Sequence, residues 1–408
     1  MRIVIIVLFV LLSLGGFAQS AKLSVQQAID IALKNNGSIK AAASEVEQQK
    51  QLKKASFDLP KTDVSLQYGQ YNSYRKDNNF TVSQTIPFTA LGSQGSYNRS
   101  LVASSEMKKA ITENELVFQV KQVYYQLAFV QARYSLLLEQ DSIYTGFLKS
   151  SSLRYKTGET NLLEKTTAET QRNEVMNQLQ KSKSDVVILQ TQLKTLLNSE
   201  TLPEISETTL VEIESKELHD TSSVSTNPSL AYMRQQVEVA QRFKKVEAAK
   251  FAPDFKVGFF TQTLIDVPNP ENGRLATIGD RFTGIQVGLS LPLWFVPHQA
   301  RLKAAEFSKQ TAQSNYRYHN LTVQGQFQQA AQQYEKNKNS LSYYHTSALP
   351  NADLILKQSQ TSFKAGEIGY GEYLLGLRNA ISIKEGYLQT LNDYNQSIIY
   401  IEFLSGNK

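Results

Sequence analysis

The chain has 408 residues, of which 41% are hydrophobic, and its formal net charge is +6. It contains no cysteine, which excludes disulfides and thiolate metal sites. The basic residues are scattered among Glu and Gln along helical stretches, a pattern that favours solvated helix faces over a nucleic-acid interface.

Residues 1–18 have the composition of a secretory signal peptide. Arg2 precedes the apolar block Ile3–Leu14, and small residues follow at the positions that a signal peptidase reads. The apolar block is too short for a comfortable membrane-spanning helix, and no later stretch approaches the roughly 20 apolar residues that such a helix needs. We therefore expect an exported protein whose mature form starts near Gln19.

The first half of the mature chain begins with a predicted helix and a strand pair. Ser24 can cap the helix, Gln27 completes a capping box, and the helical pattern continues towards Phe57. Apolar and polar side chains then alternate with a period of two over residues 62–71 and 79–87, and Pro87 ends the second stretch. These two stretches are predicted to be paired strands.

Residues 97–197 change to a helical period and predict an antiparallel hairpin that turns at Gly158. Apolar residues recur three and four positions apart on both arms, which is the spacing of a coiled-coil seam. The outbound seam consists of Val117, Val120, Tyr124, Leu127, Gln131, Tyr134 and Leu138, and the returning seam of Val175, Leu179, Ser182, Val186, Leu189, Leu193 and Leu196. At about 1.5 Å per residue, the outbound helix would be on the order of 90 Å long.

The second half repeats this order. Residues 198–226 lack a lasting period and are predicted to be a surface excursion. Residues 227–408 then carry a helix, strands at 255–263 and 282–292, and a helical hairpin at 299–404. The segment Arg154–Glu159 returns as Ser362–Glu367, so we interpret residues 19–197 and 227–408 as two structural repeats.

The four strands have the length and alternation expected of transmembrane β-strands. Four strands cannot close a barrel, and an open edge in hydrocarbon leaves backbone groups unpaired at several kcal/mol each. Three copies would supply twelve strands. Aromatic residues gather near the strand ends, where interfacial girdles belong, although each taken singly fits an ordinary core role equally well. They are Tyr68, Tyr71, Tyr74, Phe80, Phe88, Phe251, Phe255, Trp294 and Phe295.

The order and duplication of these features resemble the TolC-type outer membrane efflux protein family. The resemblance covers the whole mature chain, and the residues that carry it are the opening helix Leu23–Asn36, the strand-ending Pro87 and Pro292, and the hairpin glycines Gly158 and Gly366. It implies a mainly α-helical homotrimer whose 12-stranded β-barrel lies in the bacterial outer membrane. A long α-helical barrel would continue into the periplasm, with residues 198–226 in an equatorial belt.

The same resemblance implies a passive exit duct, coupled to an inner-membrane pump through a periplasmic adaptor protein that docks on the hairpin tips. The implied docking residues are Tyr155, Gly158, Glu159, Phe363, Gly366 and Glu367. Glu164 and Glu372 each follow a tip glycine by six residues and would constrict the entrance with carboxylates that favour cations. Leu375 stands where a further acid is expected, and a solvated-face role for either glutamate stays open.

The sequence contains no recognisable catalytic, cofactor or metal site. The histidines, His219, His298, His319 and His345, lack metal-binding spacing, and the chain is not expected to be an enzyme. A periplasmic coiled-coil adaptor or structural protein is the alternative interpretation, but two hairpins that each follow a strand pair favour the channel. The sequence does not distinguish metal ions, drugs and polypeptides as cargo.

Overall fold

The computed structural model describes residues 22–207, 209–214 and 221–406, so the predicted signal peptide lies outside the described residues. The chain divides into two compact units. The first unit comprises the residues up to Lys40, residues 112–227 and the residues from 322 onward, and the second comprises residues 41–111 and 228–321. Each unit therefore contains parts of both sequence repeats.

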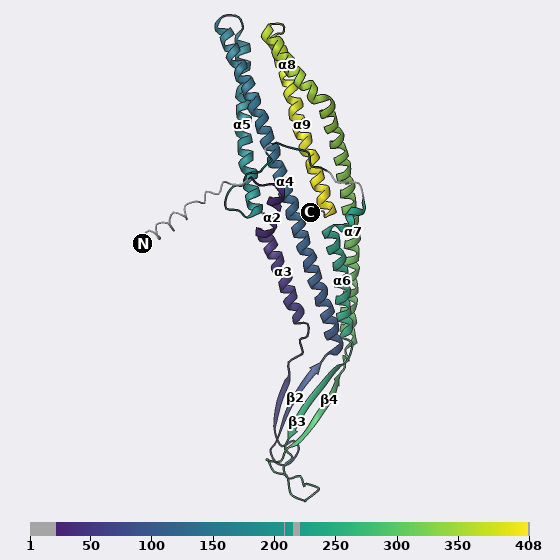
Figure 1. The fold of residues 1–408 in the computed structure, drawn as a ribbon. Coiled ribbons are helices and arrows are strands. Elements are labelled where there is room, and N and C mark those ends of the chain that lie inside the picture. Colours follow the sequence, from purple (N-terminus) through teal and green to yellow (C-terminus); the bar gives the residue numbers. More distant parts are fainter. Residues whose placement is uncertain (1–21, 208, 215–220, 407–408) are drawn as a thin grey trace, which may run out of the picture. The chain divides into compact units, whose positions relative to one another are not determined.

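The first unit is helical, and two helical hairpins dominate it (Figure 1). One hairpin joins the C-terminal part of α4 (Phe88–Lys156) to α5 (Leu162–Leu197), and the other joins α8 (Leu349–Ala365) to α9 (Tyr370–Ser405). The unit also contains α2 (Val25–Asn35), the 3₁₀-helix η1 (Thr221–Thr226), the C-terminal part of α7 (Phe295–Tyr343) and the π-helical segment η2 (Tyr344–Ala348).

The core of this unit follows the predicted seam and then shifts by one residue. Val120, Tyr124 and Leu127 of α4 are fully buried, as the heptad spacing predicts. The prediction for Leu138 is wrong, because this side chain is 48% exposed while Leu137 is buried. Gln140, Tyr144 and Phe147 are also buried, so the three-and-four spacing continues one residue earlier than predicted.

The opening helix is capped as predicted but is shorter. Ser24 Oγ accepts a hydrogen bond from the N–H of Gln27, and the Gln27 side chain accepts one from the N–H of Ser24, which confirms the capping box. The continuous helix predicted towards Phe57 is wrong, because Asn36 has extended backbone angles and separates α2 from α3 (Gly37–Lys54). The Asn36 amide also donates to the carbonyl of Leu196 at 2.8 Å, a contact that local sequence does not reveal.

The two outbound helices begin before the positions expected from the seam. Helix α4 starts at Phe88, directly after Pro87, and α7 starts at Phe295. Between α7 and α8 the chain bends (Figure 1). At η2, within this stretch, the N–H of Leu349 donates a hydrogen bond to the carbonyl of Tyr344. Pro350 follows and lacks the N–H that an unbroken helix would use, which explains why the regular hydrogen bonding is interrupted here.

The second unit contains the sheet. Its strands are β1 (Asp63–Gly69), β2 (Asp77–Ile86), β3 (Asp254–Gln262) and β4 (Phe282–Ser290), and the predicted ranges 62–71, 79–87, 255–263 and 282–292 overlap them. The strands pair antiparallel in chain order. The unit also holds most of α3, the helix α6 (Pro228–Ala249) and the N-terminal parts of α4 and α7. Because adjacent strands alternate in direction, all four helix connections leave from one end of the sheet.

One face of the sheet is apolar on every strand. In the register, Val64 lies opposite Val82, Val82 opposite Phe259, and Phe259 opposite Ile285. Most apolar side chains on this face are exposed in the protomer, notably Ile285 at 77%, whereas Val82 is half-buried. Side chains of the other face include Ser65, Thr81, Ser83 and Gln286. Within the described residues, β1 and β4 each have a strand partner on one side only.

Candidate functional site at the two hairpin tips

The two tips use the same backbone turn. Gly158 and Gly366 adopt left-handed φ values of 78° and 76°, which are costly for residues with a Cβ. In the first tip the N–H of Gly158 donates to the carbonyl of Tyr155 at 3.2 Å, and the N–H of Glu159 donates to that of Arg154 at 2.8 Å. The second tip repeats both bonds at 3.2 and 2.9 Å, and this pattern is a Schellman motif.

The returning helices begin differently. Asn161 caps α5 by accepting a hydrogen bond from the N–H of Glu164 at 3.0 Å. Gly369 occupies the same position before α9 and has no side chain to offer. Its own N–H instead donates to the Glu372 carboxylate at 3.2 Å. Helix α5 is therefore capped by the Asn161 side chain. At the start of α9 the acceptor is the Glu372 carboxylate, which was predicted to constrict the entrance.

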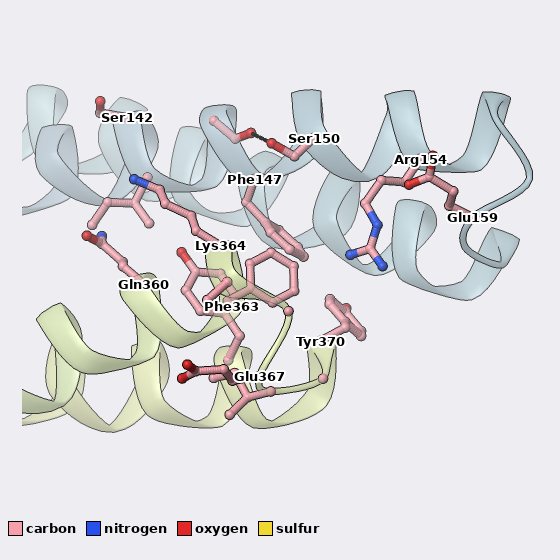
Figure 2. A pocket seen from close by; sticks show the side chains of 17 residues that line it. Ser142, Phe147, Ser150, Arg154, Glu159, Gln360, Phe363, Lys364, Glu367 and Tyr370 are labelled. Carbon is pink, nitrogen blue, oxygen red and sulfur yellow. Dashed lines mark hydrogen bonds between the residues drawn. The ribbon is translucent and has the colours of Figure 1, made fainter.

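A groove of ≈ 880 Å³ lies between the two tips within the first unit. Its lining includes the predicted docking residues Glu159, Phe363, Gly366 and Glu367 (Figure 2). Tyr155 is 40% exposed, and the Lys165 ammonium group lies 5.5 Å from the centre of its ring. The structure thus brings four of the six predicted docking residues to one groove.

An aromatic cluster forms one wall of the groove and joins the two hairpins. Phe147 of α4 faces Phe363 of α8 at a centroid distance of 5.9 Å and stacks on Tyr370 of α9 at 5.3 Å (Figure 2). Phe363 in turn stacks on Tyr373 at 4.6 Å. Burial raises the pKa of the Tyr370 and Tyr373 phenols, so both stay neutral in this packed cluster.

Arg154 adds a polar connection within the first tip. Its guanidinium lies 3.6 Å from the Glu164 carboxylate and 5.8 Å from the centre of the Phe363 ring. Glu164 also accepts a hydrogen bond from the Thr160 hydroxyl. Its side chain is only 7% exposed, because these partners and the packing of α5 enclose it. Glu372, by contrast, lies on an exposed surface of α9.

Sequence reasoning missed Phe147, Arg154, Tyr370 and Tyr373. Arg154 stands in the duplicated motif, but its counterpart is Ser362, so the repeat gave no reason to single it out. The Ser362 hydroxyl donates to Glu367 at 2.9 Å and thus serves a different carboxylate. Tyr370 and Tyr373 flank the second turn closely enough to have been noticed, whereas Phe147 is one apolar position among many on α4.

Among the residues that the structure describes, no three or more His, Asp or Glu side chains gather as a metal site would require. In the same part of the chain, none of the helices combines the length and apolar character needed to traverse a bilayer.

No family model and no curated protein matches the sequence, but solved structures match the fold. The Campylobacter jejuni CmeC outer membrane channel has a TM-score of 0.75 at 17% identity, over 94% of this chain and 85% of that one. The outer membrane protein VceC of Vibrio cholerae has a TM-score of 0.76 at 14% identity, over 94% of this chain and 96% of that one. The open state of the Neisseria gonorrhoeae MtrE outer membrane channel has a TM-score of 0.71 at 15% identity, over 94% of this chain and 88% of that one.

Proposed function

We propose that this chain, whose fold is that of the TolC-type outer membrane efflux channels, is the exit duct of a tripartite efflux or secretion system. The sheet carries the proposal. Its apolar face carries exposed side chains on all four strands, and β1 and β4 each lack a second strand partner among the described residues. A membrane would cover the apolar face, and pairing with further copies would satisfy the open edges.

Three copies would form a closed barrel of twelve strands, an even number within the range of bacterial outer membrane barrels. In each copy the repeats 19–197 and 227–408 would supply one strand pair and one helical hairpin apiece. Residues 198–226 would contribute to an equatorial belt around the helical part. The helices would extend from the outer membrane into the periplasm and enclose the same passage.

The duct performs no chemistry and takes its energy from an inner-membrane pump, to which a periplasmic adaptor connects it. We assign adaptor docking to Tyr155, Gly158, Glu159, Phe363, Gly366 and Glu367. The first tip offers apolar contacts, since Leu153, Leu162 and Leu163 are 57–71% exposed beside the turn. The second tip offers a rigid backbone turn over a packed aromatic cluster.

The entrance would be lined by acidic side chains. Glu372 is exposed, so three copies of it around a narrow passage would attract cations and repel anions. Glu164 would contribute less to this ring because Arg154 lies beside it and offsets its charge.

The direct test is to extract the full chain with detergent and insert it into planar bilayers. The proposal predicts a trimer that conducts ions and that is retained with outer membranes on cell fractionation. A monomer in the soluble periplasmic extract, with no conductance, would instead favour the alternative of a coiled-coil adaptor or structural protein.

A further inference from the structure

An unusually apolar segment follows β4 at the helix end of the sheet. Leu291, Leu293, Trp294, Phe295 and Val296 occur within six consecutive residues, and each is at least 56% exposed in the protomer. We call these five residues the junction surface. Trp294 is the most exposed at 82%. Contiguous apolar exposure of this kind marks a site that contacts another protein or a membrane.

The junction surface continues the apolar face of the sheet. Val287 and Leu289 on β4 are exposed at 74% and 53%, and Leu291 follows them in the alternating pattern. Phe88, at the start of α4, leaves the same end of the sheet, is 61% exposed and makes an edge-to-face contact with Phe255 of β3. The apolar surface thus extends beyond the strands onto the first turns of the helices.

Basic residues follow the junction surface. Helix α7 carries Arg301 and Lys303 in its early turns and has no acidic residue before Glu306. Both side chains belong to exposed residues, and neither has an ion-pair partner within the described part of the chain. Glu306 is already engaged by Lys244 at 2.6 Å. The last turn of α3, which leads into the sheet at the same end, adds Lys53 and Lys54.

We propose that the junction surface inserts into the membrane leaflet on the helical side and that Arg301 and Lys303 bind the phosphates of anionic phospholipids there. Trp is favoured at the boundary between headgroups and acyl chains, and Arg and Lys side chains extend from such sites towards phosphate. Arg301 lies six residues after Phe295, about 9 Å along the helix, which places it beyond the apolar boundary. The inference rests on the proposed outer-membrane location.

A second copy of the chain is the competing occupant of this surface. Contact between copies would explain exposed apolar side chains in a single protomer. It would not by itself explain the unpaired cations that follow them. If β4 pairs with β1 of the next copy, the start of α7 lies beside that copy's α3, whose last turn carries Lys53 and Lys54, so like charges would meet. Charge complementarity and continuity with the apolar sheet face therefore favour lipid.

The chain offers a direct probe because Trp294 is its single tryptophan. Full-length protein is reconstituted into phosphatidylcholine vesicles whose acyl chains carry bromine either near the headgroup or near the terminal methyl. The proposal predicts that Trp294 fluorescence is quenched, and more strongly by bromine near the headgroup. Absence of quenching by either lipid, in vesicles that contain conducting protein, would assign Trp294 to a contact between copies and overturn the proposal.

The lipid preference is tested with brominated phosphatidylglycerol as a minor component among unbrominated phosphatidylcholine. The double variant Arg301→Gln and Lys303→Gln should reduce the preference for phosphatidylglycerol by up to roughly five-fold for each charge removed. The control Arg317→Gln removes an exposed cation sixteen residues further along α7, about 24 Å away, and should leave the preference unchanged.

Conductance recorded from the same vesicles separates the two claims. A conducting channel whose Trp294 is quenched but whose lipid preference does not change in the double variant would overturn the role of Arg301 and Lys303. Protein that neither inserts nor conducts would overturn the proposed function and the junction surface together.

Discussion

The two hairpin tips share a backbone turn but differ in almost every side-chain contact. Both end their first helix with a glycine at φ near 77° and with the same pair of carbonyl contacts. Around the first turn the leucines are exposed and Glu164 is enclosed, whereas around the second turn the aromatics are packed and Glu372 is exposed. A duplicated motif therefore specifies a local turn, and the residues around it decide what surface each copy presents.

The largest effect is expected at the aromatic cluster. Phe147→Ala removes a side chain that is 4% exposed and that contacts Phe363, Tyr370 and Tyr373. It should lower the free energy of local opening at the second tip by about 3–5 kcal/mol. Hydrogen exchange of peptides covering residues 360–376 would measure the loss. The matched control Leu163→Ala, at 71% exposure, should change exchange little, and equal effects would contradict the packing difference between the tips.

The second largest effect is expected at the two turn glycines. Gly158→Val and Gly366→Val each place a β-branched residue at positive φ, which should cost about 1–2 kcal/mol. Neither position has a neighbouring atom within 4 Å of an added Cβ, so backbone strain is the main expected cost and the two losses should agree. Asn tolerates this conformation, and Asn variants should lose less. Hydrogen exchange at both tips measures the two losses. Unequal losses would mean that the turns are not equivalent.

The caps of the two returning helices, α5 and α9, also differ between the tips. Asn161→Ala should destabilise the first turn of α5 by about 1 kcal/mol, because the N–H of Glu164 loses its acceptor. Glu372→Ala removes the acceptor for Gly369 and a carboxylate near a helix N-terminus, worth about 0.3–1 kcal/mol. Exchange rates in the first turns of α5 and α9 report each loss, and a change at the other tip would argue against separate caps.

The smallest effect concerns charge at the entrance. Glu372→Gln should lower the cation preference of the channel, measured as a reversal potential across a planar bilayer with a salt gradient. Glu164→Gln should change the reversal potential less, because the Glu164 side chain is enclosed and only 7% exposed. If the Glu164 variant had the greater effect, Glu164 would line the passage and the assignment of Glu372 would be wrong.

Much of this fold could be predicted from local pattern. The capping box at Ser24, the seam residues up to Leu127 and the glycine turns depend on neighbours within a few positions, so their residue types are informative. The break at Asn36 and the burial of Leu137 depend on contacts and on seam phase that accumulate over long distances. The aromatic cluster joins Phe147 to residues more than 200 positions away, and no local signal identifies that pairing.

The same limit applies to the predicted site. Sequence reasoning located both turns because each is a local motif, but it treated Glu164 and Glu372 as equivalent because they share a spacing from glycine. Their environments differ because Arg154 and Thr160 contact Glu164 in the first copy. The corresponding residues of the second copy are Ser362 and Ile368. Duplication in sequence is thus a good guide to backbone and a poor guide to electrostatics.

Closure of the sheet by three copies is tested most directly by disulfide formation between β1 and β4. Within one copy these strands are three strand spacings apart, roughly 14 Å, which is too far for a disulfide. The chain has no native cysteine, so Ser65→Cys can be combined with single cysteines along β4 without background. Oxidation of the protein in membranes should yield a covalent trimer for the pair in register. Monomers alone from every pair, or dimers without trimers, would contradict the closed barrel.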